Sequence, residues 1–106
     1  MMLDSAYPHH HHMIGYRLFD LGLIEPAIKS YQRALQLDPG RPDTLDLLAR
    51  AYIKAHHIHG AEKAIDKIAQ INPRYPGLPE LNNMLSLGGF RMNEILKPNL
   101  MEVAHD

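Results

Sequence analysis

Histidine is the residue type in this sequence with the most unusual distribution. Four of the eight form the run His9 to His12, three stand at positions 56, 57 and 59, and the last is His105. Neutral imidazole is the commonest metal ligand in proteins, so a metal site is one interpretation. A helix groups ligands best at i and i+4, and neither group contains that pair or a carboxylate at a matching place. We therefore expect polar, solvated histidines and no cofactor.

Other catalytic arrangements are also missing from the sequence. It has no glycine-rich phosphate loop, no G-x-S-x-G and no H-E-x-x-H motif. Cysteine is absent, which excludes disulfides, zinc–thiolate sites and thiol chemistry. Asp43 and Asp46 fall near the start of an expected helix, where a carboxylate caps the helix and complements its dipole. The sequence therefore predicts a protein that is not an enzyme.

Composition narrows the class of protein further. The 106 residues are 45% hydrophobic and 22% charged, which is ordinary for one globular domain. The net charge is −1 and the basic residues are spread along the chain, so no nucleic-acid partner is expected. No apolar run approaches the roughly 20 residues that cross a bilayer, and the N-terminus lacks the pattern of a secretory signal. We expect a cytoplasmic protein without a membrane partner.

The elements that position these residues follow an internal repeat. When the sequence is shifted by 34 residues against itself, two segments match in size and polarity. Identical pairs include Ile24 and Ile58, Ala27 and Ala61, Lys29 and Lys63, Gln36 and Gln70, Pro39 and Pro73, and Pro42 and Pro76. Each copy therefore has the same local structure.

Each copy predicts two helices. In the first copy, Pro8 favours a helix start, an apolar face follows at helical spacing, and Gly22 favours the end. That face is expected to contain Ile14, Leu18 and Leu21. A second helix starts near Glu25 and Pro26 and stops at Asp38, Pro39 and Gly40. In the second copy we expect Asp43 as N-cap, a turn at His57, Ile58, His59 and Gly60, and an end at Asn72 and Pro73.

This pattern resembles the tetratricopeptide repeat. The matching residues are Ile14, Gly15, Leu18, Ala27, Tyr31, Ala34 and Pro39 in the first copy, and Leu48, Ala49, Tyr52, Ala61, Ile65, Ile68 and Pro73 in the second. The resemblance implies an all-α fold, a right-handed superhelical array of antiparallel helix hairpins, with two tetratricopeptide repeats and a C-terminal capping helix.

The chain is expected to divide into five parts. A flexible segment at 1–7 precedes a first repeat at 8–41 and a second at 42–75. A capping helix at 76–88 follows, with Leu78, Leu81 and Leu85 turned inward and Gly88 and Gly89 breaking the helix. The C-terminal tail at 89–106 is expected to form short helices or irregular structure, because Pro98 argues against one continuous helix.

The resemblance also implies a function, namely a protein–protein interaction scaffold or adaptor. Its concave face would bind a peptide or helix of a partner protein, and an amphipathic or acidic segment suits the side chains there. The candidate residues are Tyr16, Phe19, Asp20, Asp46, Arg50, Ile53 and Lys54, with His12 beside them on the same face. The alternative interpretation is that Phe19 and Ile53 are interhelical core and that Asp46 and Arg50 form a surface pair.

A second hypothesis concerns self-assembly. Two repeats and a cap are few for a stable array, and the C-terminal stretch carries many apolar residues, from Phe90 to Val103. A homodimer or a stacked solenoid through this surface would bury them. It predicts that Leu96→Asp and Leu100→Asp would dissociate the oligomer.

Overall fold

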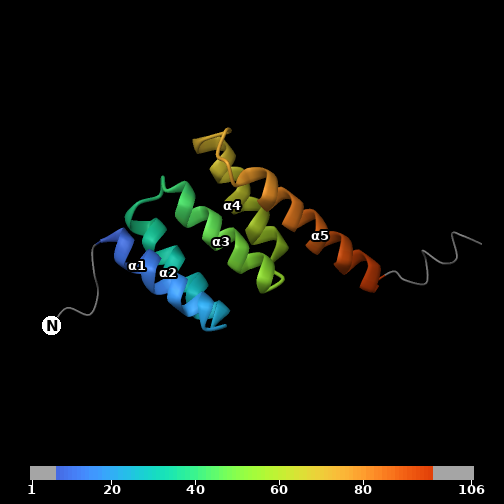
Figure 1. Cartoon of the computed structure of the whole chain (residues 1–106), viewed down its shortest axis with the longest axis horizontal. Helices are drawn as coiled ribbons and strands as arrows, with labels where there is room; N and C mark the ends of the chain where they lie inside the picture. Colours follow the sequence, from blue (N-terminus) through green and yellow to red (C-terminus); the bar gives the residue numbers. More distant parts are fainter. Residues whose placement is uncertain (1–6, 97–106) are drawn as a thin grey trace, which may run out of the picture.

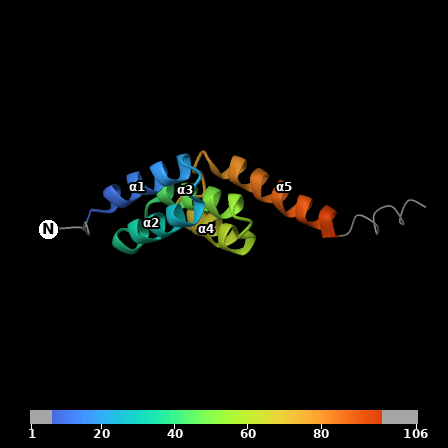
Figure 2. The ribbon, with the colours of Figure 1, turned by 90° about the horizontal axis from the view of Figure 1, so that it is seen from below.

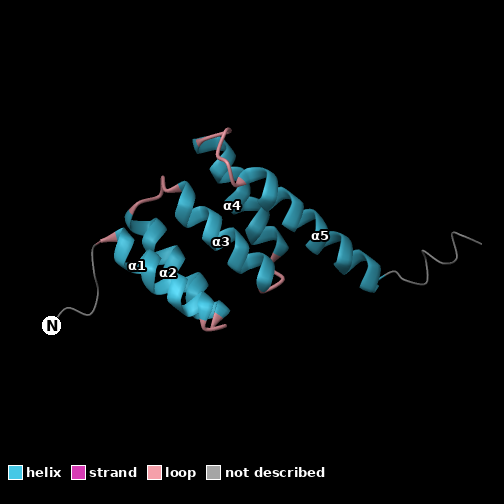
Figure 3. Cartoon of the chain, viewed as in Figure 1, coloured by secondary structure: helices cyan, strands magenta, loops and turns pink. Residues whose placement is uncertain are grey.

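The computed structural model describes residues 7–96, with side chains through residue 87. This part of the chain holds five helices and no strand, so the all-α prediction is confirmed (Figure 3). The helices are α1 (Pro8–Asp20), α2 (Ile24–Leu37), α3 (Pro42–Lys54), α4 (Ile58–Ile71) and α5 (Leu78–Leu96).

The helices form two layers. α1 and α2 make one antiparallel hairpin, α3 and α4 make the next, and α5 follows α4 and packs on α3 and α4 (Figure 1). Seen from below, α1, α3 and α5 lie in one layer and α2 and α4 in the other (Figure 2). The predicted array of helix hairpins with a further C-terminal helix is therefore confirmed.

Proline and glycine set most helix ends as predicted. Pro8 and Pro42 stand in the first turns of α1 and α3, where a missing N–H costs no hydrogen bond. Gly22 follows α1 with φ +84°, a conformation that glycine adopts at little cost. The expected N-cap at Asp43 is wrong, because α3 begins at Pro42 and the cap position is Arg41, two residues earlier. Asp43 lies in the first turn instead.

The turn between α3 and α4 was predicted too late in the sequence. α3 ends at Lys54 and α4 begins at Ile58, so the turn is 55–57 and Gly60 lies inside α4. The left-handed residue here is His56, with φ +64°. It stands 34 residues after Gly22, so the repeat conserves the conformation of this turn and not its glycine.

α5 is longer than predicted. It runs without interruption to Leu96, so the expected break at Gly88 and Gly89 is wrong. A glycine inside a helix costs only about 1 kcal/mol relative to alanine, which favourable neighbours along the helix can offset. The side chains from Gly88 onward and the segment 97–106 lie outside the described residues. The predicted self-assembly surface falls there and stays a prediction.

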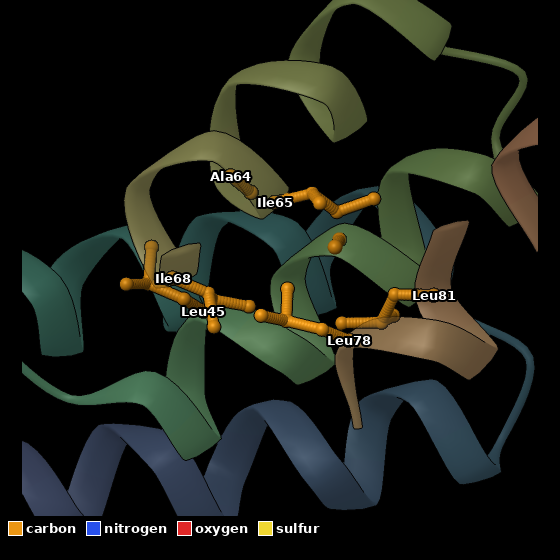
Figure 4. Packing of buried hydrophobic residues seen from close by; sticks show 7 residues of the cluster. Leu45, Ala64, Ile65, Ile68, Leu78 and Leu81 are labelled. Atoms are coloured by element: carbon orange, nitrogen blue, oxygen red, sulfur yellow. The ribbon is translucent and has the colours of Figure 1, made fainter. Parts of the chain in front are cut away.

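Two clusters of buried apolar side chains hold the layers together. One joins α3, α4 and α5 and contains Leu45, Ala49, Ala64, Ile65, Ile68, Leu78 and Leu81 (Figure 4). The other joins α2 to α3 and contains Ala27, Ile28, Tyr31, Leu48 and Ala51. α3 contributes to both clusters, so it is the central element of the described fold.

The two hairpins use small residues differently where their helices approach closely. A Cβ added to Gly15 of α1 would lie 2.6 Å from Cε1 of Tyr31 on α2, so only glycine fits against this ring. The equivalent pair in the second hairpin is Ala49 and Ile65, and both are buried. The first hairpin therefore pairs a larger side chain, Tyr31, with a smaller residue, Gly15, than the second hairpin does.

The outer side of α1 is less buried than predicted. Ile14 is 37% exposed and Leu21 is 72% exposed, although the sequence places both on an apolar face. Leu48, the repeat equivalent of Ile14, is only 5% exposed because α2 covers it. No described helix covers Ile14 in that way, so a core position of the repeat becomes a surface position.

Candidate functional site

A hollow of the described surface lies between α1 and α3, in the layer that those helices share with α5. It has a volume of about 450 Å³. Most of its lining residues carry an aromatic or imidazole ring, and one of them comes from the segment between α4 and α5. The lining residues are His12, Tyr16, Phe19, Tyr31, Asp43, Asp46, Leu47, Arg50 and Tyr75. We call this hollow the concave pocket.

Four of the seven predicted binding residues line the concave pocket. They are Tyr16 and Phe19 from α1 and Asp46 and Arg50 from α3. Asp20 and Lys54 are exposed at the last positions of their helices, and Ile53 is half-buried, and none of these three lines the pocket. Phe19 also packs against the cluster between α2 and α3, so part of its ring belongs to the core.

Arg50 forms ion pairs with carboxylates on two helices. Its Nε donates to Asp46 Oδ1 at 2.5 Å, and its Nη2 donates to Glu80 Oε1 of α5 at 3.2 Å. Nη1 lies 3.4 Å from the second oxygen of Glu80. The hydrogen bond to Asp46, followed by that to Glu80, raises the pKa of Arg50, and the same guanidinium lowers the pKa of the Glu80 carboxyl. This arginine therefore joins α3 to α5.

Asp46 is the buried centre of this arrangement. Its side chain is 10% exposed, and its second oxygen accepts a hydrogen bond from Tyr75 Oη at 2.7 Å. Burial, and then the hydrogen bond to Asp46, raises the pKa of Tyr75 to about 12, so the phenol stays protonated at neutral pH. A Cβ added to Gly77 would lie 2.7 Å from Asp46 Oδ2, so glycine at this position leaves room for the carboxylate.

His12 closes the other end of the concave pocket. Its Nδ1 lies 2.9 Å from Oγ1 of Thr44, a fully buried residue of α3, and its ring meets Tyr31 edge to face. Burial is the main cause that lowers the pKa of His12, although the negative charge of Asp43 acts in the opposite direction. The lowered pKa favours the neutral ring, which can act as a hydrogen-bonding partner.

Several lining residues could not be assigned to the pocket from the sequence. In the sequence, Tyr31 is only one of the residues that match the tetratricopeptide repeat, and Tyr75 ends the expected second repeat without belonging to any motif. The repeat offset relates His12 to Asp46, and both line the pocket, so this pairing is the one signal that could have extended the predicted set. The presence of Asp43 and Leu47 in the lining can be inferred only when the orientation of α3 is known.

Two histidines of the second repeat make pairwise contacts with carboxylates at the surface. His57 Nε2 lies 3.0 Å from Glu25 Oε2, and His59 Nδ1 lies 3.7 Å from Glu62 Oε1 in α4. Within the described residues, no three side chains of histidine, aspartate or glutamate come together as a metal would require. Among the helices of that same part, none is long and apolar enough to cross a membrane.

Comparison with models of protein families identifies a match. The family model for the tetratricopeptide repeat matches residues 18–78, which is more than half of the chain. The matched range starts near the end of α1 and ends at the first residue of α5, so it includes α2, α3 and α4 in full. No curated protein matches the sequence.

Proposed function

The chain belongs to the tetratricopeptide repeat family, and from this premise we propose that it is a non-catalytic adaptor whose concave pocket binds a segment of a partner protein. Tetratricopeptide repeats generally mediate protein–protein interactions, and this supports the class of function. The chemistry of the pocket supports the mode of binding, because it offers hydrogen-bonding rings and no group placed to react.

The observation that carries the proposal is the ring-lined pocket itself. Its volume of about 450 Å³ falls in the range of roughly 300–1,000 Å³ that ligand sites occupy. Tyrosine is enriched among the residues that dominate binding energy at interfaces, since it offers a large rigid surface and a polar tip. Tyr16 is 53% exposed and so presents most of its ring to an incoming chain.

The charges of the pocket favour an uncharged anchoring side chain. Arg50 already binds Asp46 and Glu80, and Asp43 accepts a hydrogen bond from Arg41 at 3.3 Å. An acidic partner would have to displace Glu80 from Arg50 before it gained a contact of the same kind. A large apolar or aromatic side chain needs no such exchange, so we propose that the partner inserts one between α1 and α3.

Peptides selected from a random peptide-display library against the purified protein test this function. Fluorescence anisotropy would then compare wild type, Tyr16→Ala and a control, Glu62→Ala, on the opposite layer. We expect Tyr16→Ala to weaken binding about tenfold or more, the effect of truncating an interface tyrosine that dominates binding, and Glu62→Ala to have no effect. Selected peptides that bind Tyr16→Ala as tightly as wild type would contradict the proposed site.

A Glu80→Gln variant examines the chemistry of the anchor. If the bound segment is uncharged at the pocket, this variant leaves its affinity unchanged, since Arg50 is not part of the contact. An acidic segment would bind more tightly, because the variant removes the carboxylate that competes for Arg50. A gain of affinity in this variant would therefore contradict an uncharged anchor and favour an acidic one.

A further inference from the structure

A second hollow lies on the opposite side of α3 from the concave pocket. It opens between α2 and α4, with α3 as its floor, and has a volume of about 290 Å³. The two helices that flank it form the second layer of the fold (Figure 2). Its lining residues are Leu35, Pro39, Leu45, Leu48, Tyr52, Gly60, Lys63, Ala64 and Lys67. We call it the junction groove, because it forms where the first hairpin meets the second.

The floor of the junction groove is apolar. Leu45 and Leu48 rise from α3, and Ala64 faces them from α4. Gly60 keeps the end near Tyr52 open, because a Cβ at this position would lie 3.1 Å from the tyrosine ring. The phenol of Tyr52 accepts a hydrogen bond from Gln32 Nε2 at 2.8 Å, so its polar tip is already satisfied. The floor therefore offers contact to an apolar side chain.

The rim of the junction groove is basic. Lys63 and Lys67 stand at i and i+4 on α4, so their side chains share one face of the helix, and both are exposed. Neither ammonium group has an ion-pair partner within the part of the chain that the structure describes. No carboxylate lines the groove. In the concave pocket, by contrast, Arg50 is bound by two carboxylates.

The groove depends on two repeats being adjacent. Lys29 and Arg33 are the repeat equivalents of Lys63 and Lys67, and they stand on α2 in the same relative positions. No described helix lies on the far side of α2 to form a matching floor. Two cations therefore stand at equivalent positions of α2 and α4, and those of α4 line the junction groove. The α2 pair serves as a control for the loss of two positive charges.

We propose that the junction groove binds an acidic amphipathic segment of a partner protein. One apolar side chain of the segment enters the hollow, and flanking Asp or Glu side chains meet Lys63 and Lys67. The volume suits one or two side chains, since it lies at the lower limit of about 300 Å³ for sites that hold a whole small ligand. Unpaired cations beside an apolar floor complement this chemistry, and a basic segment would be repelled.

Three labelled 12-residue peptides test the proposal by fluorescence anisotropy. The first contains only Leu and Glu, the second has Lys in place of every Glu, and the third has Ser in place of every Leu. We expect only the Leu–Glu peptide to bind, with an affinity that falls as salt rises, because exposed charges are screened. NMR chemical-shift changes are expected at Gly60, Lys63 and Ala64, not at Tyr16.

Paired variants identify the cations responsible. We expect Lys63→Gln combined with Lys67→Gln to weaken binding of the Leu–Glu peptide roughly threefold to tenfold, as for two exposed ion pairs. Lys29→Gln combined with Arg33→Gln removes the same charge from α2 and should leave the affinity unchanged. Circular dichroism checks that both double variants keep their helices.

Four results would overturn the proposal. They are an absence of binding by the Leu–Glu peptide, equal binding by its serine counterpart, equal effects of the α2 and α4 double variants, and shift changes centred on the concave pocket. Equal binding by the serine peptide would reduce the site to non-specific charge attraction. A fatty acid that binds where the peptide does not would assign the groove to a lipid instead.

Discussion

At the scale of single residues, His56 carries a conformation that its side chain disfavours. Its φ of +64° lies in the left-handed region, where a residue with a Cβ costs roughly 1–2 kcal/mol. Gly22 fills the equivalent position in the first hairpin with φ +84°. Comparison of the two copies therefore indicates that glycine suits this turn better than histidine.

Replacing His56 by glycine is therefore expected to stabilise the protein. Part of the relief is offset by the greater freedom of glycine in the unfolded chain, so we expect a gain of about 0.5–1 kcal/mol in the free energy of unfolding. Urea denaturation followed by circular dichroism measures it. His59→Gly, inside α4, should lose a similar amount, and a loss of stability in His56→Gly would contradict the prediction.

His12 is expected to make stability depend on pH. Its pKa lies below its ordinary value of 6.5, so the unfolded chain takes up a proton more readily than the folded protein. Its stabilising effect is complete above about pH 6.5 and is lost as the pH falls toward the lower pKa of the folded state. Denaturation from pH 7 to 5 should show a smaller loss in His12→Gln than in wild type.

An NMR titration checks the same histidine directly. The pKa of His12 should be found below 6.5, and Asp43→Asn should lower it further, because the Asp43 charge favours the protonated ring. Arg41 and His9, the other groups that act on this ring, favour its neutral form. A value above 6.5 in wild type would mean that burial does not control this side chain.

At the scale of helices, the two hairpins achieve close packing with different pairs of residues. Gly15 meets Tyr31 in the first hairpin, and Ala49 and Ile65 occupy the equivalent positions in the second. Tyr31 is fully buried, and a methyl group added at Gly15 would lie so close to its ring that the ring or the helices would have to shift. The small residue on one helix is therefore matched to the large residue on the other.

Gly15→Ala is expected to lower the free energy of unfolding by about 1–2 kcal/mol, because overpacking outweighs the better helix propensity of alanine. Tyr31→Ile should also destabilise, since it leaves a cavity. The double variant recreates the pair of the second hairpin, so it should lose less than the sum of the two single losses. Additive losses in this double-mutant cycle would show that the two positions are not coupled.

The sequence predicted the ends of helices well where a single residue determines that a helix begins or stops. Pro8, Gly22 and Pro39 act through their own backbone, so the ends of α1 and α2 followed from them. The conformation of His56 and the passage of α5 through Gly88 and Gly89 depend on neighbouring structure, and local propensity misplaced both.

Only part of the lining of the concave pocket could be predicted, because the lining also depends on how the helices pack. Helical spacing groups Tyr16 with Phe19, but only the packed chain brings Tyr75 and Glu80 to Asp46 and Arg50.

At the scale of the whole molecule, burial depends on which neighbour each repeat has. Leu48 and Ile14 hold the same position in the repeat, yet only Leu48 is covered by a preceding helix. Arg17 is exposed on α1, where the second repeat has the fully buried Ala51. At these two positions α1 is thus more exposed, and at one of them more polar, than the equivalent helix of the second repeat.

Alanine substitutions should distinguish the buried position in the second repeat from the exposed one in the first. We expect Leu48→Ala to cost about 2–4 kcal/mol of unfolding free energy, as for other buried leucines, and Ile14→Ala to cost less than about 1 kcal/mol. Thermal or urea unfolding of the two variants side by side provides the measurement. A loss at Ile14 as large as that at Leu48 would show that something covers the outer face of α1 in solution.

The central place of α3 has a kinetic consequence. Its side chains belong to both buried clusters, so opening this helix exposes Leu45 and Ala49 on one side and Leu48 and Ala51 on the other. The buried residues of both clusters lie outside α1, so both clusters can persist when α1 opens. Amide hydrogens should therefore exchange with deuterated water slowest in α3 and faster toward each end of the chain, a gradient that mass spectrometry of exchanged peptides would resolve.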